Sequence, residues 1–127
     1  MKGNRSLILC LTFSMANNVR LTAFFLKKAK RLLKKYHTLQ SSLEKLEDDV
    51  IKNPKMGDSY DSNIYKVRLA DESKGKGKSG GFRVITYLIE ENAASTDIYL
   101  ITIFDKSEES SIDKDDIKVI IKSEGLF

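Results

Sequence analysis

The sequence predicts an α+β protein, in which an N-terminal helical hairpin packs on a small antiparallel β-sheet of three to four strands and a helix follows at the C terminus. The hydrophobic pattern supports this prediction: it is helical in the first part of the chain, alternating from Ile64 onward, and helical again after Asp113. The chain has 127 residues, 41% of them hydrophobic, which suits one packed core. We therefore expect a single domain over residues 15–127, after a dispensable extension at residues 1–14.

The extension has a second interpretation. Lys2 and Arg5 precede the apolar run Leu7–Phe13, and the small residues around Met15 are spaced as at a signal-peptidase site. That run has the minimum length for a signal peptide and the remaining chain is Lys-rich. We therefore favour an upstream extension of a cytoplasmic protein that effectively begins at Met15, or an extra edge strand. No apolar run reaches the length of a membrane span. The single cysteine, Cys10, excludes an internal disulfide.

The first half of the chain is expected to be mainly helical. Val19–Thr22 predicts a short strand, and Thr22 is placed to cap the helix that follows. Apolar residues at helical spacing predict helices over Ala23–Tyr36 and Leu39–Val50. The short turn between these helices predicts an antiparallel hairpin.

The second half is expected to contain the sheet. Asn53–Asn63 holds the single proline and several turn-forming residues, so we expect a loop there. Alternating hydrophobicity predicts the first strand over Ile64–Ala70. Two further strands, joined as a hairpin, are predicted over Phe82–Ile89 and Asp97–Phe104. The chain is then predicted to form a helix over Asp113–Lys122, with acidic residues at its start.

Charge is distributed unevenly along the chain. The 22 Lys and Arg residues against 18 Asp and Glu give a net charge of +4. Residues 15–40 hold seven bases and no acids, and residues 64–83 hold six bases against two acids. Residues 84–127, in contrast, hold ten acids against four bases. The basic stretches predict a surface that attracts a phosphate backbone.

The second basic stretch combines cations with glycines. Lys66 and Arg68 lie on one face of the strand before a Gly-rich loop, and Arg83 lies in the strand after it. If these strands pair, the cations converge at one end of the sheet. The loop itself carries three lysines at alternate positions, Lys74, Lys76 and Lys78. Its spacing is not that of a P-loop, and a flexible, solvated hairpin loop is the alternative interpretation.

Such a cluster suits RNA cleavage. RNA supplies its own nucleophile, the 2′-hydroxyl, so a protein must align it, help remove its proton and stabilise charge on the phosphate. Clustered Lys and Arg supply that charge, and a lysine beside other cations can act as acid or base. Tyr87 shares the face of Arg83 and is a candidate to stack on a base. With His37 as the single histidine, we expect neither a Ser/His/Asp set nor a metal cofactor.

The chain from residue 18 to the C terminus resembles the RelE/HigB family of the RelE/ParE superfamily, which are toxins of bacterial type II toxin–antitoxin systems. The resemblance is carried by residues 53–58, 65–70, 74–85, 98–108 and 112–121. The run Gly-Lys-Ser-Gly-Gly-Phe-Arg at 77–83 is the part most specific for the HigB-like branch. The resemblance implies a RelE-like fold and a ribosome-dependent mRNA endonuclease, an mRNA interferase that needs no metal. It also implies a cognate antitoxin that binds DNA.

The resemblance assigns roles by position. Arg68 and Arg83 would stabilise the phosphate, and Lys66 and Lys78 would transfer protons or bind phosphate. The residues expected to contact RNA are Lys74, Lys76 and, with weaker support, Lys106. The basic face of the first helix has two interpretations of equal weight, a ribosome-docking surface and a solvated helix face, and its residues are Lys27, Lys30, Arg31 and Lys34.

Two other functions remain open. A ParE-like toxin would have the same fold and would inhibit DNA gyrase by binding rather than by cutting RNA. A catalytically inactive RNA-binding relative would keep the basic surface without the reaction. The run at 77–83 favours the ribonuclease, because it resembles that branch of the superfamily.

Overall fold

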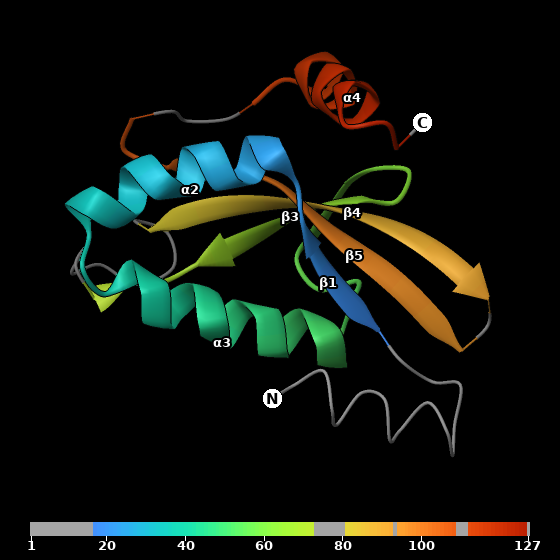
Figure 1. Ribbon diagram of the computed structural model, residues 1–127, viewed down its shortest axis with the longest axis horizontal. Coiled ribbons are helices and arrows are strands. Elements are labelled where there is room, and N and C mark those ends of the chain that lie inside the picture. The colour runs from blue at the N-terminus through green and yellow to red at the C-terminus, as the bar shows by residue number, and fades with distance from the viewer. Residues whose placement is uncertain (1–16, 73–80, 93, 109–111, 127) are drawn as a thin grey trace.

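The computed structural model describes residues 17–72, 81–92, 94–108 and 112–126. Within these residues five strands form one sheet in the order β1-β5-β4-β3-β2 (Figure 1). The elements along the chain are β1 (Asn18–Leu21), α2 (Ala23–Lys35), α3 (Leu39–Lys52), β2 (Asp58–Asp61), β3 (Ile64–Leu69), β4 (Phe82–Asn92), β5 (Ser95–Asp105) and α4 (Lys114–Ser123). The predicted α+β class is confirmed.

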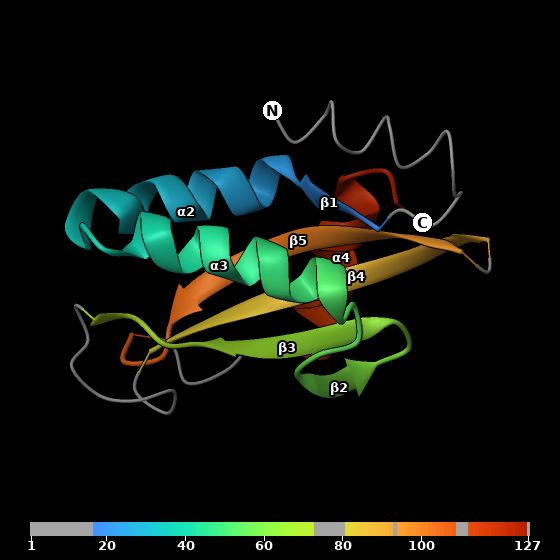
Figure 2. The same cartoon turned by 90° about the horizontal axis from the view of Figure 1, so that it is seen from below.

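The sheet separates two apolar clusters. Helices α2 and α3 lie side by side on one face of the sheet, and α4 lies on the other (Figure 2). The larger cluster joins buried residues of α2 and α3, such as Leu32 and Leu46, to strand residues such as Val67 and Val84. The smaller cluster packs Ile117 and Ile121 of α4 on the opposite face of the strands. The central strands β3, β4 and β5 therefore each have one face directed toward the helical hairpin and one toward α4.

Polar side chains fix where the helical hairpin begins and turns. The Thr22 hydroxyl accepts a hydrogen bond from the Phe25 amide at 3.1 Å, which caps α2 as the sequence predicts. The hydroxyls of Thr38 and Ser42 donate to the two carboxylate oxygens of the buried Asp71, at 2.7 and 2.5 Å. Asp71 therefore holds the turn between α2 and α3 against the chain that leaves β3.

The expected loop over Asn53–Asn63 is wrong in part, because it contains the strand β2. This strand pairs antiparallel with β3 at one edge of the sheet, through a tight turn in which Asn63 takes a positive φ of 60°. The polar residues of the segment are typical of a loop, yet an edge strand needs a partner on one side only and tolerates them.

The prediction of an antiparallel sheet of three to four strands is wrong in both strand direction and strand number. The first strand, β1, is paired, and it runs parallel to β5 at the other edge of the sheet. Parallel pairing is possible because α2, α3 and three strands separate β1 from β5 along the chain. The sheet is consequently mixed, and its strand count is higher than predicted.

A bulge in β5 sets which of its residues face α4. The register with β4 shifts between Ile85 and Thr86, so that Thr86 lies opposite Leu100 and Ile85 opposite Thr102. Ile101 is the extra residue, and its side chain joins the α4 cluster. Beyond the bulge, Phe104 lies opposite Arg83.

The expectation of a dispensable extension at residues 1–14 lies outside the described residues. Among the helices that the structure describes, none combines the length and the apolar character needed to cross a membrane.

Candidate functional site

Three of the predicted site residues lie together on two neighbouring strands. Strands β3 and β4 pair antiparallel, and Arg68 lies directly opposite Arg83. Residues paired in this way project from the same face of a sheet. Lys66 is two residues from Arg68 along β3, so its side chain projects from that face too. The three cations thus converge as the sequence predicts, on the face that α4 partly covers.

The two arginines differ in exposure. Arg68 is exposed, whereas Arg83 is buried and donates a hydrogen bond to the Phe82 carbonyl at 3.2 Å. Burial lowers the pKa of the Arg83 guanidinium, the charge of Arg68 lowers it further, and the Asp58 carboxylate raises it. Arg83 remains cationic at neutral pH, because an arginine is not deprotonated in proteins under ordinary conditions. Two guanidinium groups side by side form a site that favours an anion.

An open hollow borders this cluster. It has a volume of about 350 Å³ and is lined by Met56, Gly57, Asp58, Lys66, Val67 and Arg68. Gly57 has a φ of 92°, and a Cβ at this position would lie 2.5 Å from the Lys66 carbonyl oxygen. The lack of a side chain at Gly57 therefore lets the chain pass close to β3 and leads Asp58 into pairing with Lys66.

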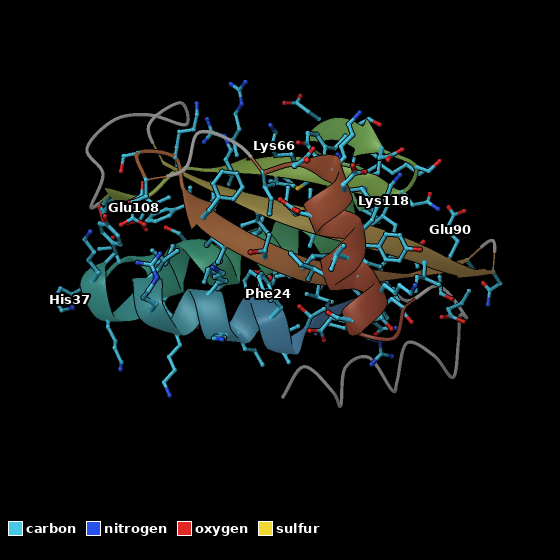
Figure 3. All side chains as sticks on the ribbon, turned by 90° about the horizontal axis from the view of Figure 1, so that it is seen from above. Phe24, His37, Lys66, Glu90, Glu108 and Lys118 are labelled. Carbon is cyan, nitrogen blue, oxygen red and sulfur yellow. The ribbon has the colours of Figure 1, made fainter. Side chains whose placement is uncertain are left out.

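A tyrosine ring links Lys66 to α4. The Lys66 ammonium lies 5.0 Å from the centroid of the Tyr60 ring, and the Lys114 ammonium lies 5.4 Å from it. The Tyr60 hydroxyl donates to the carbonyl of Ile112, just before α4. Figure 3 shows Lys66 near an end of α4. This contact positions the Lys66 ammonium at the border of the hollow.

Two other predicted site residues, Tyr87 and Lys106, lie among the described residues, but neither lines the hollow. Tyr87 lies opposite Ile64 and Tyr99 and packs against the apolar cluster of α4, so its ring is half-buried. Lys106 follows β5 immediately, and its amide donates to the Gly81 carbonyl at 3.1 Å. The base-stacking role of Tyr87 and the RNA contact of Lys106 stay predictions.

The basic residues of α2 lie across the sheet from Arg68 and Arg83. The four that were predicted to bind RNA are exposed, but Arg31 donates to Glu108 at 3.1 Å, and Lys35 forms an ion pair with the same carboxylate at 3.4 Å. A hollow of about 420 Å³ lies beside this helix, lined by Leu26, Ala29, Lys30, Leu33 and Lys34. The structure therefore divides the predicted basic residues between two surfaces that the sheet separates.

Sequence reasoning missed two neighbours of the cation cluster. Asp58 and Tyr60 were expected in a loop, but both lie on β2 and face the side of the sheet that carries Lys66. The available signal was an Asn at the end of a short turn, directly before the alternating residues of β3. The predicted roles of Lys74, Lys76 and Lys78 lie outside the described residues. Within the described ranges, no three His, Cys, Asp or Glu side chains are grouped to hold a metal ion.

Comparisons with known proteins support the fold. No family model matches the sequence. Among solved structures, the fold is similar to that of the toxin RelE of Escherichia coli, determined in the free state as a variant with two arginines replaced by alanine. The match has a TM-score of 0.51 and 18% sequence identity, and it covers 76% of this chain and 90% of that one. The chain described here therefore has a RelE-like α+β fold.

Proposed function

We propose that this chain is the toxin of a bacterial type II toxin–antitoxin system and that it cuts mRNA on the ribosome. One observation carries the proposal: within a RelE-like fold, Lys66, Arg68 and Arg83 share one face of β3 and β4 beside an open hollow. The protein with the similar structure is itself described as a toxin.

The chemistry of RNA suits this cluster. The 2′-oxygen attacks the adjacent phosphorus, and negative charge builds up on the phosphate oxygens in the transition state. Guanidinium groups bind phosphate oxygens in a bidentate manner, and their charge is worth more where water is partly excluded. Arg83 is buried and Arg68 borders the hollow, so the two together offer such a site without a metal ion.

The proposal includes three partners in the cytoplasm: mRNA, the ribosome and a DNA-binding antitoxin. The expected RNA contacts of Lys74, Lys76 and Lys78 fit it, because these residues join β3 to β4 along the chain. We propose that ribosomal RNA or an acidic segment of the antitoxin contacts the basic surface of α2 by charge complementarity.

The proposal is tested in a purified translation reaction by mapping new mRNA 5′ ends, with and without ribosomes on the message. We expect in-frame cuts that require translation. Arg68→Ala should remove most of the cleavage, whereas Lys45→Ala, which changes an exposed lysine of α3, should cut as the wild type does.

Other results would contradict this function. DNA breaks without mRNA cleavage would identify a gyrase inhibitor. Binding to ribosomes with neither reaction, by folded protein free of antitoxin, would identify an inactive RNA-binding protein.

A further inference from the structure

A carboxylate lies among the cations of the proposed RNA site. Asp58 is the first residue of β2 and is paired directly with Lys66, so its side chain projects from the same face as Lys66, Arg68 and Arg83. It also lines the hollow of about 350 Å³ that Lys66 and Arg68 border. Asp58 and Arg68 are both exposed, so a ligand in this hollow would contact both.

The backbone conformation at Gly57 fixes the position of Asp58. Gly57 precedes it with a φ of 92° and passes too close to the Lys66 carbonyl to carry a side chain. In the described part of the chain no ion pair joins Asp58 to a cation, in contrast to Asp61 on the same strand, which pairs with Lys118 at 3.0 Å. Asp58 lines the hollow, and its carboxylate interacts with the charge of the Arg83 guanidinium.

A carboxylate is unfavourable in a site that only binds RNA, because it repels the phosphate backbone. One reason for its presence is charge compensation, because Asp58 raises the pKa of the Arg83 guanidinium. Its exposed position in the hollow allows a second role. Of the described residues that line the hollow, Asp58 is the one whose side chain can accept a proton at neutral pH without first losing one. Lys66 and Arg68 act there as hydrogen-bond donors and cations.

We propose that Asp58 is the general base of the reaction, which accepts the proton of the attacking 2′-hydroxyl. This inference rests on the proposed RNA cleavage. As the proton moves to the Asp58 carboxylate, the 2′-oxygen forms a bond to phosphorus and the bond from phosphorus to the 5′-oxygen breaks. The 5′-oxygen takes a proton from water. The products are a 2′,3′-cyclic phosphate and a 5′-hydroxyl, and Asp58 then returns its proton to solvent.

Lys66 is placed to support this step. Its ammonium lies 5.0 Å from the centroid of the Tyr60 ring, and Lys66 is the residue opposite Asp58 in the strand pair. In the transition state, Lys66 would lie beside the general base, and Arg68 and Arg83 would stabilise the negative charge on the phosphate oxygens.

The test separates binding from cleavage in Asp58→Asn, which keeps the size of the side chain and removes its charge. Binding is measured to ribosomes that carry an mRNA with a 2′-deoxy nucleotide at the mapped cleavage position, which cannot be cut. Cleavage is measured under single-turnover conditions on the matching RNA. We expect binding to be unchanged or tighter, and the cleavage rate to fall by about 100-fold or more.

Two further variants sharpen the result. Asp58→Glu keeps a carboxylate and should retain a substantial part of the cleavage. Asp116→Asn removes an exposed carboxylate from the first turn of α4 and should cut at the wild-type rate. In Asp58→Asn, hydroxide must replace the missing base, so its residual rate should rise with pH more steeply than that of the wild type.

Cleavage by Asp58→Asn at or above the wild-type rate would overturn the inference and leave the proposed function in place. A parallel loss of binding and cleavage would also overturn it, because it would indicate a role in holding β2. If the wild type cuts no RNA, the proposed function fails and the inference fails with it.

Discussion

Arg68 and Arg83 occupy one register position on two strands, but their surroundings give them different roles. Arg83 is buried and donates to the Phe82 carbonyl, so its side chain is part of the packing as well as of the cation cluster. Arg68 is exposed and borders the hollow. The function of this pair is therefore tested most cleanly at Arg68.

Arg68→Ala should reduce the proposed RNA cleavage by about 100-fold, the usual effect of removing one donor to a transition-state oxyanion. The free energy of unfolding in urea should change by no more than about 0.5 kcal/mol, because the side chain is exposed. Arg68→Lys should recover part of the activity, since an ammonium keeps the charge and loses the bidentate geometry. Wild-type cleavage by Arg68→Ala would remove Arg68 from the site.

Gly81 is constrained by the end of the preceding strand. A Cβ at this position would lie 2.3 Å from the Leu69 carbonyl oxygen, which is backbone and cannot rotate away. Gly81→Ala should therefore lower the free energy of unfolding by about 1–3 kcal/mol, measured by urea denaturation. Gly125→Ala is the comparison: it also strains the backbone, at a φ of 77°, but its Cβ meets nothing within 4 Å. An equal or larger loss at Gly125 would show that steric overlap at Gly81 is not the cause.

At the scale of elements, α4 packs on the sheet through Ile117 and Ile121, and polar contacts also join it to β2 and to the start of α2. Tyr60 of β2 donates to the Ile112 carbonyl just before the helix, and Asp61 of β2 pairs with Lys118 in its second turn. Just beyond its end, the Glu124 carboxylate accepts hydrogen bonds from the Ala23 and Phe24 amides, at 3.2 and 3.1 Å. These contacts fix how much of the β3–β4 face the helix covers.

The Asp61–Lys118 ion pair should make stability depend on pH. The hydrogen bond from Lys118 and that from the Ser62 amide lower the pKa of Asp61, and the Asp61 partner raises the pKa of Lys118. The contribution of the pair is therefore present at neutral pH, is lost as pH falls through the lowered pKa of Asp61, and is also lost as pH rises through the raised pKa of Lys118. The difference in unfolding free energy between the wild type and Asp61→Asn should shrink as pH falls below about 4.

A double-mutant cycle with Lys118→Gln checks this assignment. The coupling between the two substitutions, measured by urea denaturation, should be present at neutral pH and absent in acid. A coupling that is the same at both pH values would contradict it.

Glu124 should stabilise α2 from outside the helix. Its carboxylate meets two amides that lack partners in the first turn, where the helix dipole also favours a negative charge. Glu124→Ala should lower the free energy of unfolding by about 1 kcal/mol and speed hydrogen exchange at the start of α2. The exposed Glu91, at the end of β4, provides the control substitution, Glu91→Ala, for which we expect little change. Equal effects at the two positions would argue against capping by Glu124.

At the scale of the whole molecule, the sheet separates two basic surfaces. One contains Lys66, Arg68 and Arg83 on the α4 side, and the other contains Lys27, Lys30 and Lys34 of α2. Because they lie on opposite sides of the sheet, a substitution on α2 should affect association with a large partner without affecting the reaction.

Replacing Lys27, Lys30 and Lys34 together by Gln should weaken binding to ribosomes and reduce the slope of log affinity against log salt concentration by about 2, if these lysines meet RNA phosphates. The single-turnover cleavage rate at saturating protein should not change. The matched control replaces three exposed lysines in and just after α3: Lys45, Lys52 and Lys55. The same slope in both triple variants would favour a solvated helix face on α2.

Local patterns in the sequence predicted most elements. The apolar spacing of α2 and α3, the Thr22 cap, the alternation of β3 and the acids before α4 all depend on near neighbours in the chain, and each element appears within a few residues of its predicted position. The sequence also indicates that the cations converge if the strands around Arg68 and Arg83 pair, and these strands do pair. The strand β2 was missed because its residues are typical of a loop, and Asp58 was missed with it.

By itself, the sequence determined the α+β class, the order of the main elements and the three described cations of the β3–β4 cluster, because these follow from local periodicity and spacing. The tertiary structure alone decided that β1 pairs in parallel with β5, that β2 brings Asp58 opposite Lys66, and that the bulge at Ile101 places Phe104 opposite Arg83. These features depend on contacts between segments far apart in the chain or on the register between strands. Register follows from the hydrophobic pattern and the turn geometry, but the irregularities in β2 and β5 shift it away from what simple alternation predicts.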